Sequence, residues 1–134
     1  MWVRVPPPVP TFKQGLFYMK ATIGKYKYND DFSQECEIII EDHDHVSPYH
    51  TIARISLPLL QNFQKKTKSY PSLSIEEEIQ KGETPDQTWD RLLSEMIYAM
   101  NHIANDEVAE SEMISQRVDR GLLLFGKYFR DLWS

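Results

Sequence analysis

The stretch that decides the fold is 86-DQTWDRLLSEMIYAMNHI-103. Its apolar side chains recur at intervals of three and four residues, at Trp89, Leu92, Leu93, Met96, Ile97, Met100 and Ile103. This spacing places them on one face of an α-helix. Asp86 precedes the stripe, where an aspartate is typical of a helix N-cap. The stretch therefore predicts an amphipathic helix whose apolar face must be covered by other elements.

A second helix is predicted upstream, beginning near Tyr49 to Thr51. Its apolar side chains share one face: Ile52, Ile55, Leu59, Leu60 and Phe63. Pro58 lies inside this run and should kink the helix, because its ring removes a backbone hydrogen bond. Residues 68–85 read as a loop with a possible short helix at Ile75 to Lys81.

A third helix is predicted from about Val108 to Asp131. Its inward side chains are expected to be Ile114, Val118, Leu122, Phe125 and Phe129, with Leu132 just beyond. Gly121 and Gly126 each cost a helix about 1 kcal/mol relative to alanine, but a missing side chain permits close approach of a neighbouring backbone. A binding patch could be formed by four aromatic residues, Tyr98, Tyr128, Phe129 and Trp133. Core packing is expected for most of them, with Trp133 the one expected to be partly exposed.

The N-terminal third carries two β-like runs. Residues 20–28 alternate short or apolar with basic or aromatic side chains, and residues 35–41 centre on Ile38, Ile39 and Ile40. Asn29 to Asp31 reads as the turn between them. A hairpin alone is marginally stable and must pack on helices. The expected fold class is therefore α+β, a two-stranded β-hairpin packed on about three α-helices.

Composition sets limits on function. The chain has 134 residues, of which 41% are hydrophobic, and a formal net charge of −5. This length suits one domain, and the acidic balance gives no electrostatic footprint for nucleic acid. The single cysteine, Cys36, cannot form an internal disulfide, and its isoleucine-rich strand predicts a buried, inert side chain. No apolar run approaches the roughly 18 residues that span a bilayer. A cytoplasmic protein is expected, with no membrane contact and no cofactor.

The first ten residues, 1-MWVRVPPPVP-10, allow three interpretations. They could be a polyproline II ligand or a disordered leader. The favoured interpretation is that they resemble the translated 3′ end of a tRNA gene, because one permitted coding yields a T-arm-like stem and loop followed by CCA. Met19 then resembles the true start. Residues 1–18 are predicted to be a disordered or artefactual leader, and residues 19–134 a single α+β domain.

One loop carries the best candidate binding residues. They are Asp42, His43, Asp44, His45 and His50, with Glu41 nearby. Imidazole and carboxylate groups are ligands that zinc or manganese accepts. The spacing matches no motif with a known mechanism, and a solvated loop after a strand explains it as well. No metal ligand and no catalytic residue is assigned.

The segment 121-GLLLFGKY-128 nearly spells a phosphate-binding P-loop. The Ser or Thr that should hold magnesium is replaced by Tyr128, and the segment is expected inside a helix. Gly121 and Gly126 are therefore interpreted as packing glycines.

Three stretches carry a family resemblance: 52–60, 89–97 and, most specifically, 120-RGLLLFGKYFRDLW-133. They resemble a family of small tailed-phage proteins to which no activity is assigned, and the similarity covers roughly Lys20 to Trp133. Such proteins often show a D-T-W-S-x-D-x-T-L-A pattern, from which this chain departs at Val46 and Tyr49. The resemblance implies a phage origin and no particular chemistry.

The expected function is a small, acidic, non-enzymatic protein that binds a host or phage macromolecule in the cytoplasm of an infected cell. The partner is expected to be a protein, because an acidic surface can block a basic site on another protein. Two alternatives stay open. One is a metal-dependent hydrolase or small-nucleotide binder that uses the loop from Asp42 to His50, and the other is a minor virion component. The oligomeric state is left open.

Overall fold

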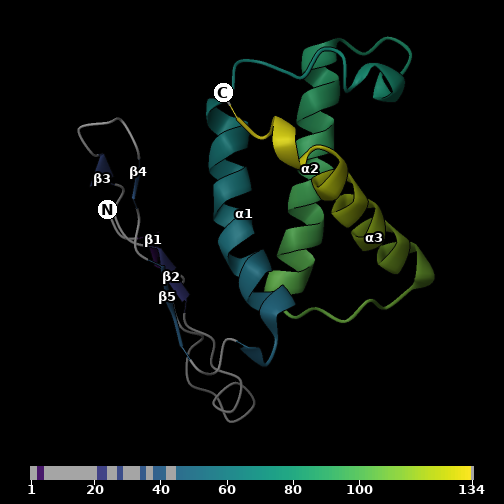
Figure 1. The fold of residues 1–134 in the computed structure, drawn as a ribbon. Coiled ribbons are helices and arrows are strands. Elements are labelled where there is room, and N and C mark those ends of the chain that lie inside the picture. The colour runs from purple at the N-terminus through teal and green to yellow at the C-terminus, as the bar shows by residue number, and fades with distance from the viewer. Residues whose placement is uncertain are drawn as a thin grey trace. The chain divides into compact units, whose positions relative to one another are not determined.

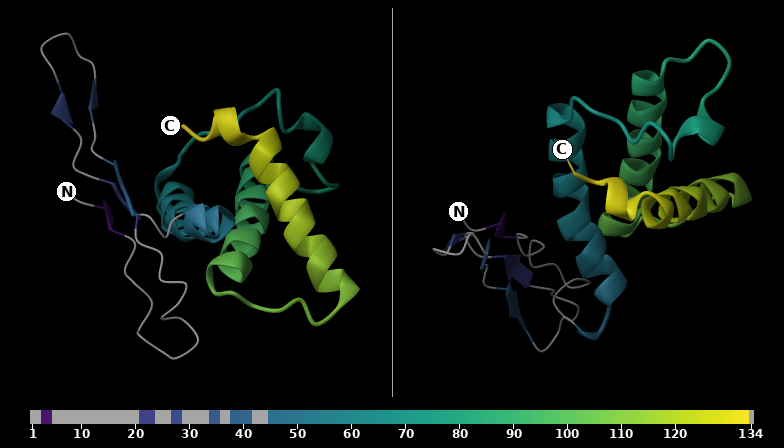
Figure 2. Two further views of the ribbon diagram at one scale, coloured as in Figure 1. Left: turned by 60° about the horizontal axis from the view of Figure 1, so that its bottom comes forward. Right: turned by 45° about the horizontal axis from the view of Figure 1, so that its top comes forward.

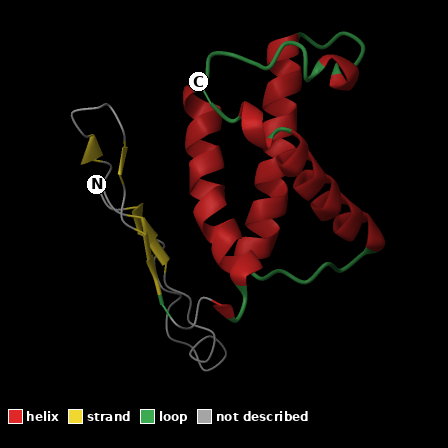
Figure 3. Cartoon of the chain, viewed as in Figure 1, coloured by secondary structure: helices red, strands yellow, loops and turns green. Residues whose placement is uncertain are grey.

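The computed structural model describes residues 3–4, 21–23, 27–28, 34–35, 38–41 and 45–133. The chain divides into two compact units, Met1–Ile52 and Ala53–Ser134. Helix α1 (Pro48–Lys66) crosses this division near its own beginning. Figure 1 shows the course of the chain, and Figure 3 distinguishes its helices from its strands.

The first unit contains short antiparallel strands. β2 (Ala21–Ile23) lies between β1 (Val3–Arg4) and β5 (Ile38–Ile40), with Val3 opposite Ile23 and Thr22 opposite Ile39. β3 (Lys27–Tyr28) pairs with β4 (Gln34–Glu35). Of the predicted leader, residues 1–18, the structure describes only Val3 and Arg4, and Cys36 lies outside the described residues.

The predicted α+β class is wrong, because the described chain is mostly helical. Each strand is only two or three residues long, too short for the hairpin layer that the sequence suggested. Ile38, Ile39 and Ile40, which form β5 and were expected at the centre of the second strand of the hairpin, are all exposed. Without a buried strand face, the apolar core among the described residues is built by the helices and the turns that adjoin them.

The second unit is organised around α2 (Pro85–Ala104), which lies between α1 and α3 (Glu112–Lys127) in the views of Figures 1 and 2. Two 3₁₀ turns complete it, η2 (Glu76–Glu78) before α2 and η3 (Phe129–Asp131) directly after α3. The third helix is therefore shorter than predicted, since it begins after Ser111 and ends before Tyr128. Among the described residues, no helix combines the length and the apolar character needed to cross a membrane.

The beginning of α2 is set by a capping box. Thr84 is the N-cap: its hydroxyl oxygen accepts from the Gln87 backbone N–H at 3.3 Å, and the Gln87 side chain accepts from the Thr84 N–H at 3.0 Å. Pro85 follows at the first helical position, where its missing N–H costs nothing. The prediction of Asp86 as the cap is therefore wrong by two residues.

The core of this unit is centred on the apolar face of α2. Its largest aromatic contacts run across all three helices, because Trp89 meets the ring of Phe63 edge to face at 6.5 Å and that of Tyr128 at 5.6 Å. The buried members of this core are Ala53, Leu60, Ile75, Trp89, Leu92, Leu93, Met96, Met100, Leu124 and Tyr128. The stripe predicted from residues 86–103 is thus confirmed as the centre of the fold.

The predicted faces of the flanking helices are confirmed only in part: Leu60, Phe63, Phe125 and Leu132 lie in or against the core as expected. In α1, Ala53 and Leu60 are buried, whereas Ile52 and Leu59 are exposed. In α3, Gly121 and Leu124 are buried, whereas Leu122 is 39% exposed, and in the following turn Phe129 is 59% exposed. In α3 the difference is explained by Gly121. Its backbone lies against Glu95 and Ala99 of α2, so the line of contact with α2 runs through Gly121 and not along the middle of the apolar stripe.

Candidate functional site

The predicted histidine loop is only partly described. Asp42, His43 and Asp44 lie outside the described residues. His45 is exposed, and His50 is half-buried in the first turn of α1 with its ring edge-on to Tyr49 at 6.5 Å. Among the described positions, no group of His, Cys, Asp and Glu could hold a metal ion. A metal or nucleotide site in this loop stays a prediction without structural support.

The segment that resembled a P-loop is helical. Gly121 to Lys127 belong to α3, so their backbone N–H groups are committed to the helix and cannot cradle a phosphate. A Cβ atom at position 121 would overlap the Glu95 carbonyl and the Ala99 Cβ, which confirms Gly121 as a packing glycine. At position 126 a Cβ atom would meet nothing within 4 Å, so packing within the chain gives Gly126 no role.

A charged cluster ties the segment before α2 to that helix. The Arg91 guanidinium donates to both carboxylate oxygens of Glu83, at 2.9 and 3.1 Å, and to the Glu78 backbone carbonyl at 2.7 Å. The Thr88 hydroxyl donates to Glu83 at 2.6 Å. Hydrogen bonds from Arg91 and then Thr88 lower the pKa of Glu83 from 4.5 to about 2. These contacts account for the lowered pKa of Glu83 as the result of structural anchoring.

A second set of charges joins η2 to the end of α3. Arg120 lies 3.3 Å from one carboxylate oxygen of Glu78, and the Lys127 ammonium lies 3.6 Å from the other. Lys127 also approaches Glu77 at 3.9 Å. The Glu78 carboxylate therefore lies between two cations that are two turns apart along α3.

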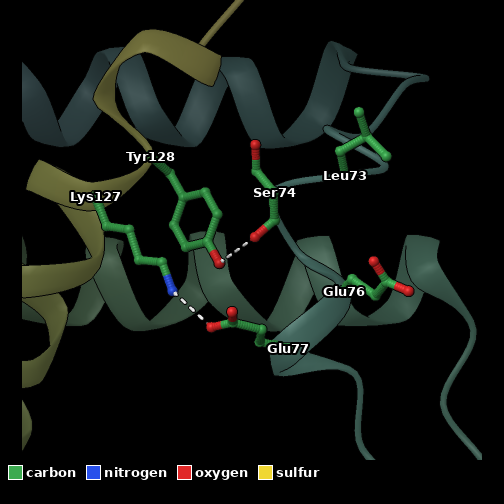
Figure 4. A pocket seen from close by; sticks show the side chains of 6 residues that line it. All are labelled: Leu73, Ser74, Glu76, Glu77, Lys127 and Tyr128. Atoms are coloured by element: carbon green, nitrogen blue, oxygen red, sulfur yellow. Dashed lines mark hydrogen bonds and ion pairs between the residues drawn. The ribbon is translucent and has the colours of Figure 1, made fainter.

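A surface pocket of about 350 Å³ lies beside these ion pairs. Its lining residues are Leu73, Ser74, Glu76, Glu77, Lys127 and Tyr128. Figure 4 shows Lys127 reaching toward Glu77 and the Tyr128 hydroxyl toward the backbone of Ser74, to whose carbonyl it donates at 3.0 Å. The Lys127 ammonium and the Tyr128 hydroxyl are thus already engaged with other groups that line the pocket.

The protonation states of the Lys127 and Tyr128 side chains do not suit acid–base catalysis. Burial raises the pKa of Tyr128, so this side chain is a phenol at neutral pH. The adjacent Tyr128 and then Glu78 raise the pKa of Lys127, which remains a cation. A general acid or base works best with a pKa near the working pH. Neither Lys127 nor Tyr128 is therefore poised to transfer a proton near neutral pH.

The side of α3 that faces away from α2 is the other notable feature. It carries Asp119, Leu122, Leu123 and Gly126, at helical spacing, and three exposed residues follow soon after the end of the helix: Phe129, Arg130 and Trp133. Leu123 and Trp133 are each 74% exposed. We call these seven residues the outward face. Neither Asp119 nor Arg130 has an ion-pair partner among the described residues.

In comparisons with known proteins, no protein family, no curated protein and no solved structure matches the chain.

Sequence reasoning missed the outward face because it assigned Leu122 and Phe129 to the core. Trp133 was correctly expected to be exposed, and Tyr128 was correctly expected in the core. The missed signal was the size of the apolar stripe: residues 118–133 contain more large apolar side chains than one line of contact with α2 can bury.

Proposed function

We propose that the chain is a small phage-encoded, non-enzymatic protein that binds a host or phage protein in the cytoplasm of the infected cell. The observation that carries this proposal is the outward face. Three large apolar side chains, Leu123, Phe129 and Trp133, are more than half exposed, and Arg130 has no ion-pair partner among the described residues. Clustered exposed apolar residues are rare on monomeric proteins and mark interaction sites.

The composition of the outward face supports a protein as the partner. Aromatic residues and arginine are enriched in protein–protein interfaces and supply most of their binding energy. The net charge of −5 argues against a nucleic acid in that place. The resemblance of 120-RGLLLFGKYFRDLW-133 to a tailed-phage family supports the phage origin, and the same segment forms the greater part of the outward face.

The test is capture of partner proteins from a lysate of phage-infected bacteria with matched variants of the full chain. Leu123→Glu places a charge in the outward face. Val108→Glu makes the same change in charge at an apolar residue that is 81% exposed and lies outside this face. We expect a bound protein that the wild type and Val108→Glu retain and that Leu123→Glu loses.

Two outcomes would contradict the proposal. Equal capture by both variants would show that the outward face is not the binding surface. The second outcome comes from native mass spectrometry of the full chain. A mass gain equal to a metal ion or a nucleotide would favour a metal-dependent or nucleotide-binding protein instead.

A further inference from the structure

We propose that a second copy of this chain covers the outward face when no other partner is bound, with the two α3 helices antiparallel about a two-fold axis. This inference rests on the proposed function, because it assigns an occupant to the same surface. Self-association would then compete with capture of the partner. The charges and the shape of the outward face are both consistent with one two-fold axis.

The charges of the outward face complement themselves. Asp119 lies on the second turn from the start of α3, and Arg130 lies in η3 after the end of the helix. Both side chains are exposed and neither has an ion-pair partner among the described residues. In an antiparallel pair of α3 helices centred between positions 124 and 125, the turn that carries Asp119 lies beside the end of α3 of the partner subunit, which Arg130 of the partner subunit follows by three residues. A two-fold axis forms this pair twice.

The shape of the face has the same centre of symmetry. Leu123 and Gly126 are also equidistant from the point between positions 124 and 125. Leu123 is 74% exposed, and the space above Gly126 is open, with nothing within 4 Å of an added Cβ. The axis that pairs the charges therefore places each leucine against the open glycine of the partner subunit.

This arrangement gives a reason for Gly126. A glycine in a helix interior costs about 1 kcal/mol relative to alanine. At position 121 the close approach of α2 requires a glycine. At position 126 no described atom of this chain requires one. A side chain from a second molecule that seats on the backbone does require it. A parallel pair would instead place aspartate beside aspartate and arginine beside arginine.

The test is sedimentation velocity of the full chain over a concentration series, with charge-exchange variants. Wild type is expected to convert from monomer to dimer as concentration rises. Asp119→Arg and Arg130→Asp should each raise the dimer Kd by about tenfold, through loss of attraction and added repulsion. The double variant should restore dimerisation, because it exchanges the two charges across the axis. Lys68→Asp, a comparable change at an exposed loop residue outside the face, should leave the Kd unchanged.

A wild type that stays monomeric at every concentration, or a double variant that is no better than the single ones, would overturn the inference. The capture experiment keeps this outcome separate from the proposed function. If the chain is monomeric but Leu123→Glu still loses the captured protein, only the dimer fails. If the chain dimerises and capture does not depend on Leu123, the proposed function fails and the dimer stands.

Discussion

Gly121 of α3 lies directly against the backbone carbonyl of Glu95 in α2, so closely that a Cβ atom at position 121 would overlap it. This contact fixes how α3 lies on α2 and therefore which of its side chains reach the core. It brings Leu124 and Tyr128 into the core and leaves Leu122 and Phe129 at the surface. The packing of one glycine thus creates the exposed face on which the proposed function depends.

The two glycines of α3 should respond oppositely to alanine. Gly121→Ala should lower the free energy of unfolding, because the overpacking cost of about 1–3 kcal/mol exceeds the gain in helix propensity of about 1 kcal/mol. Gly126→Ala should raise it by up to about 1 kcal/mol, since its Cβ has open space. Urea unfolding followed by far-UV circular dichroism, at a concentration where the chain is monomeric, measures both. A stabilising Gly121→Ala would contradict the close packing of α2 and α3.

Ile75 should contribute to stability as a core residue although it precedes the 3₁₀ turn η2 rather than lying in a long helix. Its side chain is fully buried in the core of the second unit. Ile75→Ala should lower the free energy of unfolding by about 2–5 kcal/mol. Leu73→Ala is the matched control, because Leu73 is 87% exposed and should change stability by less than about 0.5 kcal/mol. Equal effects of the two substitutions in urea unfolding would show that this segment is not part of the core.

The hydroxyl of Tyr128 should stabilise the contact between α3 and the segment before η2. Tyr128→Phe keeps the buried ring against Trp89 but leaves the Ser74 carbonyl without this donor. The expected loss is about 1 kcal/mol in the free energy of unfolding. Tyr70→Phe, at an exposed tyrosine, should leave stability unchanged. A Tyr128→Phe variant as stable as wild type would mean that water replaces this hydrogen bond without cost.

Glu83 should make folding sensitive to acid. Its pKa falls from 4.5 to about 2 in the folded chain, chiefly through the hydrogen bond from Arg91. The folded state favours the ionised form of Glu83 more than the unfolded state does. The contribution of Glu83 to the free energy of unfolding is therefore complete above pH 4.5 and is lost as the pH falls toward 2. Glu83→Gln should therefore have a lower free energy of unfolding than wild type at neutral pH. The difference between the two free energies should become smaller as the pH falls from 4.5 toward 2. A gap in unfolding free energy that stays constant over this range would contradict the ion pair.

The helices were readable from the sequence because their signals are local. The stripe from Trp89 to Ile103 specifies one buried face at helical spacing, and it is the centre of the observed core. The cap was predicted at Asp86 and lies at Thr84, although the local signal was present: Thr84 and Gln87 fit the S/T-x-x-E/Q capping box, with Pro85 at the first helical position. The β-like runs around Ile38 to Ile40 carried an equally local signal, but strand propensity alone does not supply a surface to bury them.

The sequence by itself determined which residues form helices and that an apolar face of α2 needs cover. Only the tertiary structure decided the rotation of α3 on α2, because that rotation depends on the fit of Gly121 against the Glu95 carbonyl, two groups far apart in the chain. Periodicity gives the direction of an apolar stripe but not how much of it a neighbour can cover. The part of the α3 stripe that α2 does not cover, Leu122 and Phe129, contributes to the outward face that we propose as the binding surface.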